Sequence, residues 1–94
     1  RESPTFKLWR LFEAKGAKVE YFDPYCRAVG RNREYPEYTG RRSLDLAKTR
    51  GRFDVIVICT AHDSVDHNAL ARRARLVIDT RNAISRKARN VVKA

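Results

Sequence analysis

The sequence lacks the glycine-rich loops with which many proteins hold nucleotides. Neither GxGxxG nor GxxxxGK[ST] occurs, and the four glycines are scattered at positions 16, 30, 40 and 51. The chain therefore cannot hold a dinucleotide or a nucleotide in the usual glycine-rich way. It also lacks any apolar run close to the roughly 18 residues that a membrane-spanning helix needs. We expect a soluble domain.

Cysteine is scarce as well. Cys26 and Cys59 have neither the CxxC spacing of a metal or redox site nor the density of a disulfide scaffold, so we expect free thiols in a reduced, cytoplasmic setting. Ninety-four residues suffice for one small domain with a modest core, and we interpret residues 1–94 as one domain. Because the chain opens at Arg1 without methionine, we expect it to be a fragment of a longer protein.

Positive charge, in contrast, is abundant, with a formal net charge of +10. The excess lies in residues 24–51, with 7 basic and 3 acidic groups, and in residues 83–94, with 4 basic groups and no acidic one. Basic segments of this kind attract phosphorylated metabolites, nucleic acid or acidic partners. Composition alone favours the simpler alternative of a solvated surface.

The first part of the chain predicts a helix followed by a strand. Ser3 is a suitable N-cap, Pro4 suits the first helical position and Gly16 suits the C-cap. Between them runs a wide apolar stripe, made of Phe6, Leu8, Trp9, Leu11, Phe12 and Ala14. The segment AKVEYF, from Ala17 to Phe22, then predicts a strand that stops at Asp23-Pro24.

The remainder predicts further strands that alternate with helices. Residues 25–42 are polar and basic and predict an irregular excursion, and residues 43–48 a short helix. The segment from Phe53 to Thr60 contains VIVIC, the pattern of a strand buried on both faces. A helix over residues 64–75, with inward Val65, Leu70, Ala71 and Ala74, and the strand LVID over residues 76–79 follow.

This alternation predicts the α/β class, as a small Rossmann-like, three-layer domain with a mostly parallel sheet. We expect its first strand to precede Arg1 in the longer protein.

In such sheets, ligands bind outside the carboxyl ends of the strands. Those ends are Asp23-Pro24-Tyr25, Thr60-Ala61-His62-Asp63 and Asp79-Thr80-Arg81-Asn82, all of them polar. Arg81 is the strongest candidate, because a guanidinium presents a planar fork to phosphate or carboxylate. The alternative, that Arg81 pairs with Asp79 or caps the sheet edge, carries equal weight at this point.

Other candidates are weaker. His62 could act as an acid, a base or a phosphate donor, although such a residue more often bonds its own loop. His62 and His67, five residues apart and without cysteines at metal spacing, make a poor metal site. Cys59 lies in an apolar strand and Cys26 has no evident base partner, so neither is a convincing nucleophile. No catalytic constellation is complete.

Four stretches together resemble the C-terminal domain of the UDP-glucose/GDP-mannose dehydrogenase family. They are RESPTFKLWRLFEAKGAKVEYFDPY, DVIVICTAHDSVD, LVIDTRNA and a final VVKA, and they cover essentially the whole chain. Within the family, the chain is most similar to enzymes that oxidise UDP-glucose or UDP-N-acetylhexosamines at C6. It differs in having Thr60-Ala61-His62 where relatives often have T-D-H, and in a more basic middle loop.

The resemblance implies an NAD-dependent UDP-sugar 6-dehydrogenase that makes a carboxylate by two hydride transfers. It implies that NAD is bound mainly by an N-terminal domain and that the enzyme forms a homodimer or higher oligomer. Arg1 would reach the NAD pyrophosphate and Arg81 the UDP-sugar. The family's nucleophilic cysteine and catalytic lysine lie upstream, so the fragment alone would be inactive.

Two other hypotheses stay open. The basic segments, with Tyr25, Tyr35 and Tyr38 interleaved, could stack on single-stranded nucleic acid, although no known nucleic-acid-binding motif is present. Alternatively, the domain could chiefly support dimerisation through its basic loop.

Overall fold

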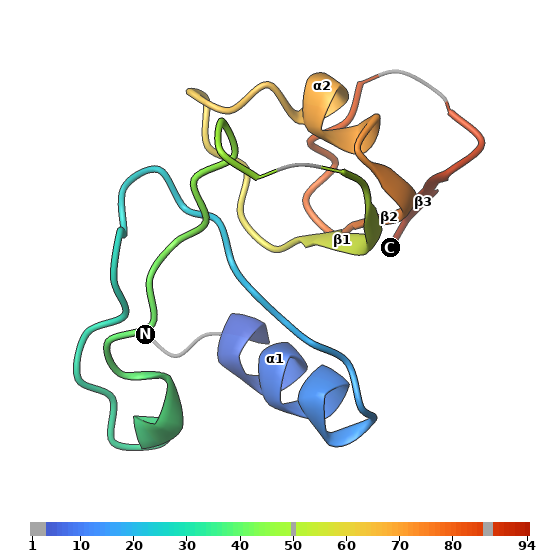
Figure 1. The fold of residues 1–94 in the computed structure, drawn as a ribbon. Coiled ribbons are helices and arrows are strands. Elements are labelled where there is room, and N and C mark those ends of the chain that lie inside the picture. Colours follow the sequence, from blue (N-terminus) through green and yellow to red (C-terminus); the bar gives the residue numbers. More distant parts are fainter. Residues whose placement is uncertain (1–3, 50, 86–87) are drawn as a thin grey trace. The chain divides into compact units, whose positions relative to one another are not determined.

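A computed structural model describes residues 4–49, 51–85 and 88–94 of the chain. The residues group into two compact units, Arg1–Thr49 and Arg50–Ala94. The elements, in chain order, are helix α1 (Pro4–Ala14), 3-10 helix η1 (Pro36–Tyr38), strand β1 (Phe53–Ile58), helix α2 (His67–Ala71), strand β2 (Ala74–Asp79) and strand β3 (Val91–Lys93) (Figure 1). The predicted N-cap Ser3 and the predicted NAD contact Arg1 lie outside the described residues.

Helix α1 ends as the sequence predicts, at a glycine. Gly16 has φ +95°, in the left-handed region that favours glycine. Its backbone N–H donates to the Glu13 carbonyl (3.0 Å), and the Ala17 N–H donates to the Phe12 carbonyl (3.1 Å). This is the Schellman pairing, which satisfies two carbonyls that the end of the helix would otherwise leave without partners.

An aromatic cluster forms the core of unit 1. The Trp9 and Tyr38 rings stack with centroids 4.2 Å apart, and both side chains are buried. Phe6 stacks on Tyr35 and on Tyr38, with centroids 5.4 and 6.0 Å apart. The aromatic residues of the excursion over residues 25–42 therefore stabilise this unit. Because Tyr35 and Tyr38 pack inside this cluster, the hypothesis that their rings stack on nucleic-acid bases is wrong for these two residues. Tyr25 remains 70% exposed.

Two predicted elements of unit 1 are not formed. Residues 17–22 form no strand. A strand needs a continuous ladder with a neighbour, whereas this segment receives isolated bonds, such as that from the Leu44 N–H to the Tyr21 carbonyl (2.8 Å). Residues 43–48 form no helix, only a single turn over residues 46–48. The Asp45 carboxylate accepts the Ala47 N–H (3.0 Å) as at the start of a helix, and the Thr49 N–H donates to the Asp45 carbonyl (3.0 Å), but the turn ends at residue 48.

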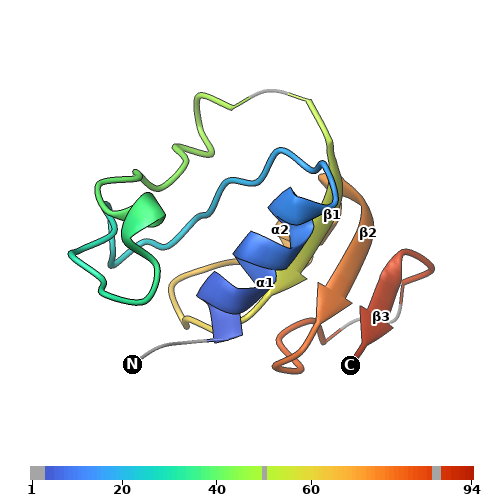
Figure 2. The ribbon, with the colours of Figure 1, turned by 90° about the horizontal axis from the view of Figure 1, so that it is seen from below.

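Unit 2 contains a three-stranded parallel sheet in the order β1-β2-β3. The three arrows point the same way in Figure 2. β1 pairs with β2 in the register Val55↔Leu76, and β2 pairs with β3 in the register Asp79↔Lys93. The predicted α/β class with a parallel, Rossmann-like sheet is confirmed. β3 was not predicted, because its two valines stand in a basic tail whose composition does not indicate a strand.

Helix α2 is much shorter than the predicted helix over residues 64–75. It begins after Asp66, whose carboxylate accepts the Ala69 N–H (3.0 Å) as an N-cap, and it ends at Ala71. Ala74, predicted to lie in the helix, instead begins β2 and is fully buried. The core of unit 2 consists of Ile58, Ala71, Ala74, Val77 and Ile84.

Within unit 2, the other face of this sheet is only partly covered. Val55, Leu76 and Val92 lie on it and are 41%, 37% and 50% exposed. The prediction that VIVIC is buried on both faces is therefore wrong, because in the described part of unit 2 the short helix α2 packs on one side. Across the described ranges no helix is long and apolar enough to cross a bilayer.

Candidate functional site

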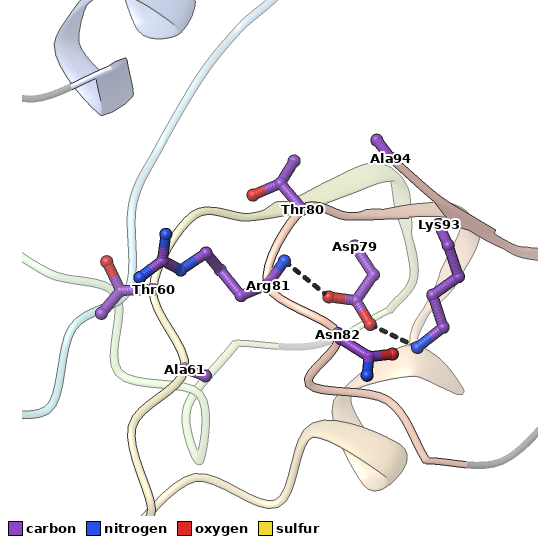
Figure 3. A pocket seen from close by; sticks show the side chains of 8 residues that line it. All are labelled: Thr60, Ala61, Asp79, Thr80, Arg81, Asn82, Lys93 and Ala94. Carbon is purple, nitrogen blue, oxygen red and sulfur yellow. Dashed lines mark hydrogen bonds and ion pairs between the residues drawn. The ribbon is translucent and has the colours of Figure 1, made fainter.

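A pocket of about 550 Å³ lies at the carboxyl ends of the strands of unit 2 (Figure 3). Its lining comes from the segment that follows β1, from the end of β2 and the loop after it, and from the end of β3 with the next residue: Thr60, Ala61, Asp79, Thr80, Arg81, Asn82, Lys93 and Ala94. Thr80 extends the pairing of β1 and β2 past the last strand residue. Its N–H and its hydroxyl both donate to the Ile58 carbonyl, at 3.3 and 2.6 Å. The pocket floor is thus continuous with the sheet.

Asp79 is the organising group of this edge. Its side chain is completely buried, and its carboxylate accepts three backbone N–H groups of the loop that follows: Arg81 (3.1 Å) and Ala83 (3.0 Å) on Oδ1, and Ile84 (2.8 Å) on Oδ2. Burial by itself would raise the pKa of Asp79. The hydrogen bond from Lys93 and the three backbone donors outweigh burial and hold the pKa well below its ordinary value. Asp79 is therefore an ionised structural residue.

Lys93 supplies the countercharge, a role that no pattern in the sequence indicates. Its ammonium lies 2.8 Å from Asp79 Oδ2 and also donates to the Ile84 carbonyl. The parallel register of β2 and β3 places the two residues side by side. A single lysine in a basic tail looks like surface charge, so only the strand pairing reveals it.

The loop over residues 80–84 is held at both ends. At one end, Asp79 binds its backbone; at the other, the Ile84 side chain is buried in the core of unit 2. Between them Asn82 has φ +54°, a left-handed conformation that asparagine adopts more readily than most residues. The loop thus has a defined shape that displays Arg81.

Arg81 is exposed on the lining of this pocket. Its backbone N–H binds Asp79, but Figure 3 shows its guanidinium turned away from that carboxylate, which Lys93 occupies instead. Among the described residues the Arg81 guanidinium has no hydrogen-bond or ion-pair partner. The alternative, in which Arg81 pairs with Asp79 through its side chain, therefore does not apply here. A free guanidinium in a polar pocket suits an anionic ligand.

Of the other two predicted site segments, one belongs to unit 1 and the other to unit 2. The segment Asp23-Pro24-Tyr25 belongs to unit 1, where the Asp23 carboxylate accepts the Tyr25 N–H (2.8 Å) in a local turn. Of the four residues from Thr60 to Asp63, only Thr60 and Ala61 line the pocket, and the His62 carbonyl accepts the Val65 N–H (3.1 Å). Cys26 and Cys59 are free thiols outside it.

The described ranges contain no group of three histidine, cysteine, aspartate or glutamate side chains that could hold a metal ion.

Comparison with known proteins gives one match. The model of the UDP-glucose/GDP-mannose dehydrogenase family, UDP binding domain, matches residues 1–86. That range includes the pocket residues contributed by the ends of β1 and β2, whereas β3 and Lys93 lie beyond it. No curated protein and no solved structure matches the chain.

Proposed function

Because the chain belongs to the UDP-glucose/GDP-mannose dehydrogenase family, as its UDP binding domain, we propose that the pocket beyond β2 receives the pyrophosphate of a UDP-sugar. Arg81 is the residue that binds it. The observation that carries this proposal is the exposed Arg81 guanidinium, which has no partner in the described part of the chain and lies in a polar pocket with Thr60, Thr80 and Asn82.

Physical chemistry supports a phosphate ligand at this place. A guanidinium can donate two parallel hydrogen bonds to phosphate oxygens. The nearest carboxylate, Asp79, is neutralised by Lys93 and turned into the loop, so it does not repel an anion strongly. The pocket therefore combines one cation that is unpaired among the described residues, Arg81, with the Asp79–Lys93 ion pair and with neutral hydroxyl and amide groups.

For the full-length protein we propose an NAD-dependent UDP-sugar 6-dehydrogenase, which oxidises the C6 hydroxyl to a carboxylate in two hydride transfers. NAD would be bound mainly by an N-terminal domain. The glycines with positive φ, at positions 16, 40 and 51, lie outside the pocket, so the described residues offer NAD no glycine-rich cradle. Arg1, proposed to reach the NAD pyrophosphate, lies outside those residues. Residues 1–94 would be inactive alone.

Calorimetric titration of the full-length protein with UDP-glucose and UDP-N-acetylglucosamine tests this proposal. Arg81→Ala should weaken binding by about 1.5–3 kcal/mol, the loss of a charged hydrogen bond, which is roughly tenfold to 150-fold in affinity. Arg75→Ala is the matched control, because Arg75 is an exposed arginine of β2 outside the pocket.

Two results would count against it. Unchanged affinity in Arg81→Ala, or an equal loss in Arg75→Ala, would remove Arg81 from the site. A wild-type protein that binds neither sugar nucleotide would contradict the substrate assignment itself.

A further inference from the structure

We propose that Lys93 is a positioning residue for the UDP-sugar, because its ion pair with Asp79 fixes the loop over residues 80–84 in the shape that presents Arg81. This inference rests on the proposed function and adds to it a residue beyond the matched family range, residues 1–86.

The first step of the argument is the buried carboxylate. Asp79 is 1% exposed, and a buried charge is tolerated only when a countercharge and hydrogen bonds compensate it. Both of its oxygens are occupied by the backbone of the loop, at Arg81, Ala83 and Ile84. The position of the carboxylate therefore determines the positions of these three backbone N–H groups.

The second step is that Lys93 holds the same loop from the opposite side. Its ammonium contacts Asp79 Oδ2 at 2.8 Å and donates to the Ile84 carbonyl. Residue 84 thus donates its N–H to the carboxylate and accepts from the lysine. The ammonium links the carboxylate to the far end of the loop.

The third step is that the sheet fixes Lys93 itself. β3 pairs with β2 beside it, and the Ala94 N–H donates to the Asp79 carbonyl (3.0 Å) while the Val77 N–H donates to the Asn90 carbonyl (2.7 Å). Because Lys93 uses two of its three ammonium donors within the protein, its main action is on the loop, and through the loop on Arg81.

The experiment is a double-mutant cycle on the full-length protein with UDP as the probe. Calorimetry would compare wild type, Lys93→Met, Arg81→Ala and the double variant. Lys93→Arg keeps the charge, and Arg89→Met is the matched control, since Arg89 is an exposed cation of the same tail outside the pocket. Thermal melts would verify that each variant is folded at the assay temperature.

We expect Lys93→Met to weaken UDP binding about tenfold, within the coupling seen between contacting residues. The affinity of Lys93→Arg for UDP should stay within about threefold of that of the wild type, and Arg89→Met should leave the affinity unchanged on this scale. In the Arg81→Ala background, Lys93→Met should cause no further loss, because Lys93 would act through Arg81.

The contrary outcomes differ from one another. If wild type binds UDP and folded Lys93→Met binds it equally well, the positioning role is refuted while the proposed function survives. Additive losses in the double variant would refute it too, since Lys93 would then contact the ligand directly. Failure of wild type to bind UDP would instead remove the proposed function. If Lys93→Met does not fold, Lys93→Gln, which keeps a donor without the charge, takes its place in the cycle.

Discussion

Replacing Asp79 with asparagine should destabilise the protein severely, although the substitution changes little in size. The carboxylate accepts four hydrogen bonds, three from backbone N–H groups and one from Lys93. Asparagine offers one oxygen, so its amide N–H₂ must face donors that have lost their acceptor. Two donors are left without partners: the Ile84 N–H and Lys93 if the oxygen replaces Oδ1, or the N–H groups of Arg81 and Ala83 if it replaces Oδ2.

The size of the effect follows from these groups. Each unsatisfied buried partner costs about 1–3 kcal/mol. The contribution from Lys93 is at the low end, because its side chain is 44% exposed and solvent screens its charge. We therefore expect a loss of about 2–5 kcal/mol in the free energy of unfolding. For a domain of this size that lowers the melting temperature by at least about 8 °C.

The assay is thermal unfolding followed by circular dichroism, with Asp63→Asn as the control. Asp63 is exposed, so its substitution should stay within about 0.5 kcal/mol of wild type. Equal melting temperatures for Asp79→Asn and Asp63→Asn would refute the structural role of the carboxylate.

The pH dependence of stability provides a second test of the role of Asp79. The folded-state pKa of Asp79 lies below its ordinary value of 3.8, so its contribution to stability is present above that pH and is lost as the pH falls below it. The difference in stability between wild type and Asp79→Asn should therefore be smaller at pH 3 than at pH 7. A difference that does not change with pH would contradict the ionised state.

Two further predictions concern unit 1. Burial, followed by the hydrogen bond to Glu13, raises the pKa of Tyr38 from 10.0 to about 12, so stability is lost as the pH rises through that range. Tyr38→Phe should lower the free energy of unfolding by about 0.5–1.5 kcal/mol at neutral pH and should remove part of this alkaline loss of stability. The fluorescence of Trp9, the only tryptophan, reports the unfolding. An alkaline transition that is unchanged in Tyr38→Phe would contradict the raised pKa of Tyr38. Gly16→Ala should cost about 1 kcal/mol because of its positive φ, whereas Gly30→Ala should be neutral or stabilising. Equal melting temperatures for the two alanine variants would count against the left-handed cap.

Local signals in the sequence predicted the parts of the fold that depend on neighbouring residues. Gly16 marked the end of α1, and the β-branched run from Val55 to Ile58 marked a strand of a parallel sheet. The rule that ligands bind at the carboxyl ends of parallel strands identified Arg81, which follows β2, as a candidate site residue. The structure places that residue on the lining of a pocket.

Most of the failures have a different cause, which is that they depend on pairing between residues far apart in the sequence. Residues 17–22 have strand-like composition, yet a strand forms only where a neighbour supplies a ladder. The helix over residues 64–75 is cut short because Ala74 is drawn into the sheet beside Phe53. Lys93 could not be recognised as the partner of Asp79 before the register of β3 was known.

The spacing of 14 residues between Asp79 and Lys93 has a consequence for biosynthesis. At about 5–20 residues per second, the lysine leaves the ribosome roughly one to three seconds after the aspartate. During that interval the carboxylate has no ammonium partner, and burying it would be costly. The edge of the sheet around residues 79–84 should therefore stay open on the nascent chain and close only when β3 emerges.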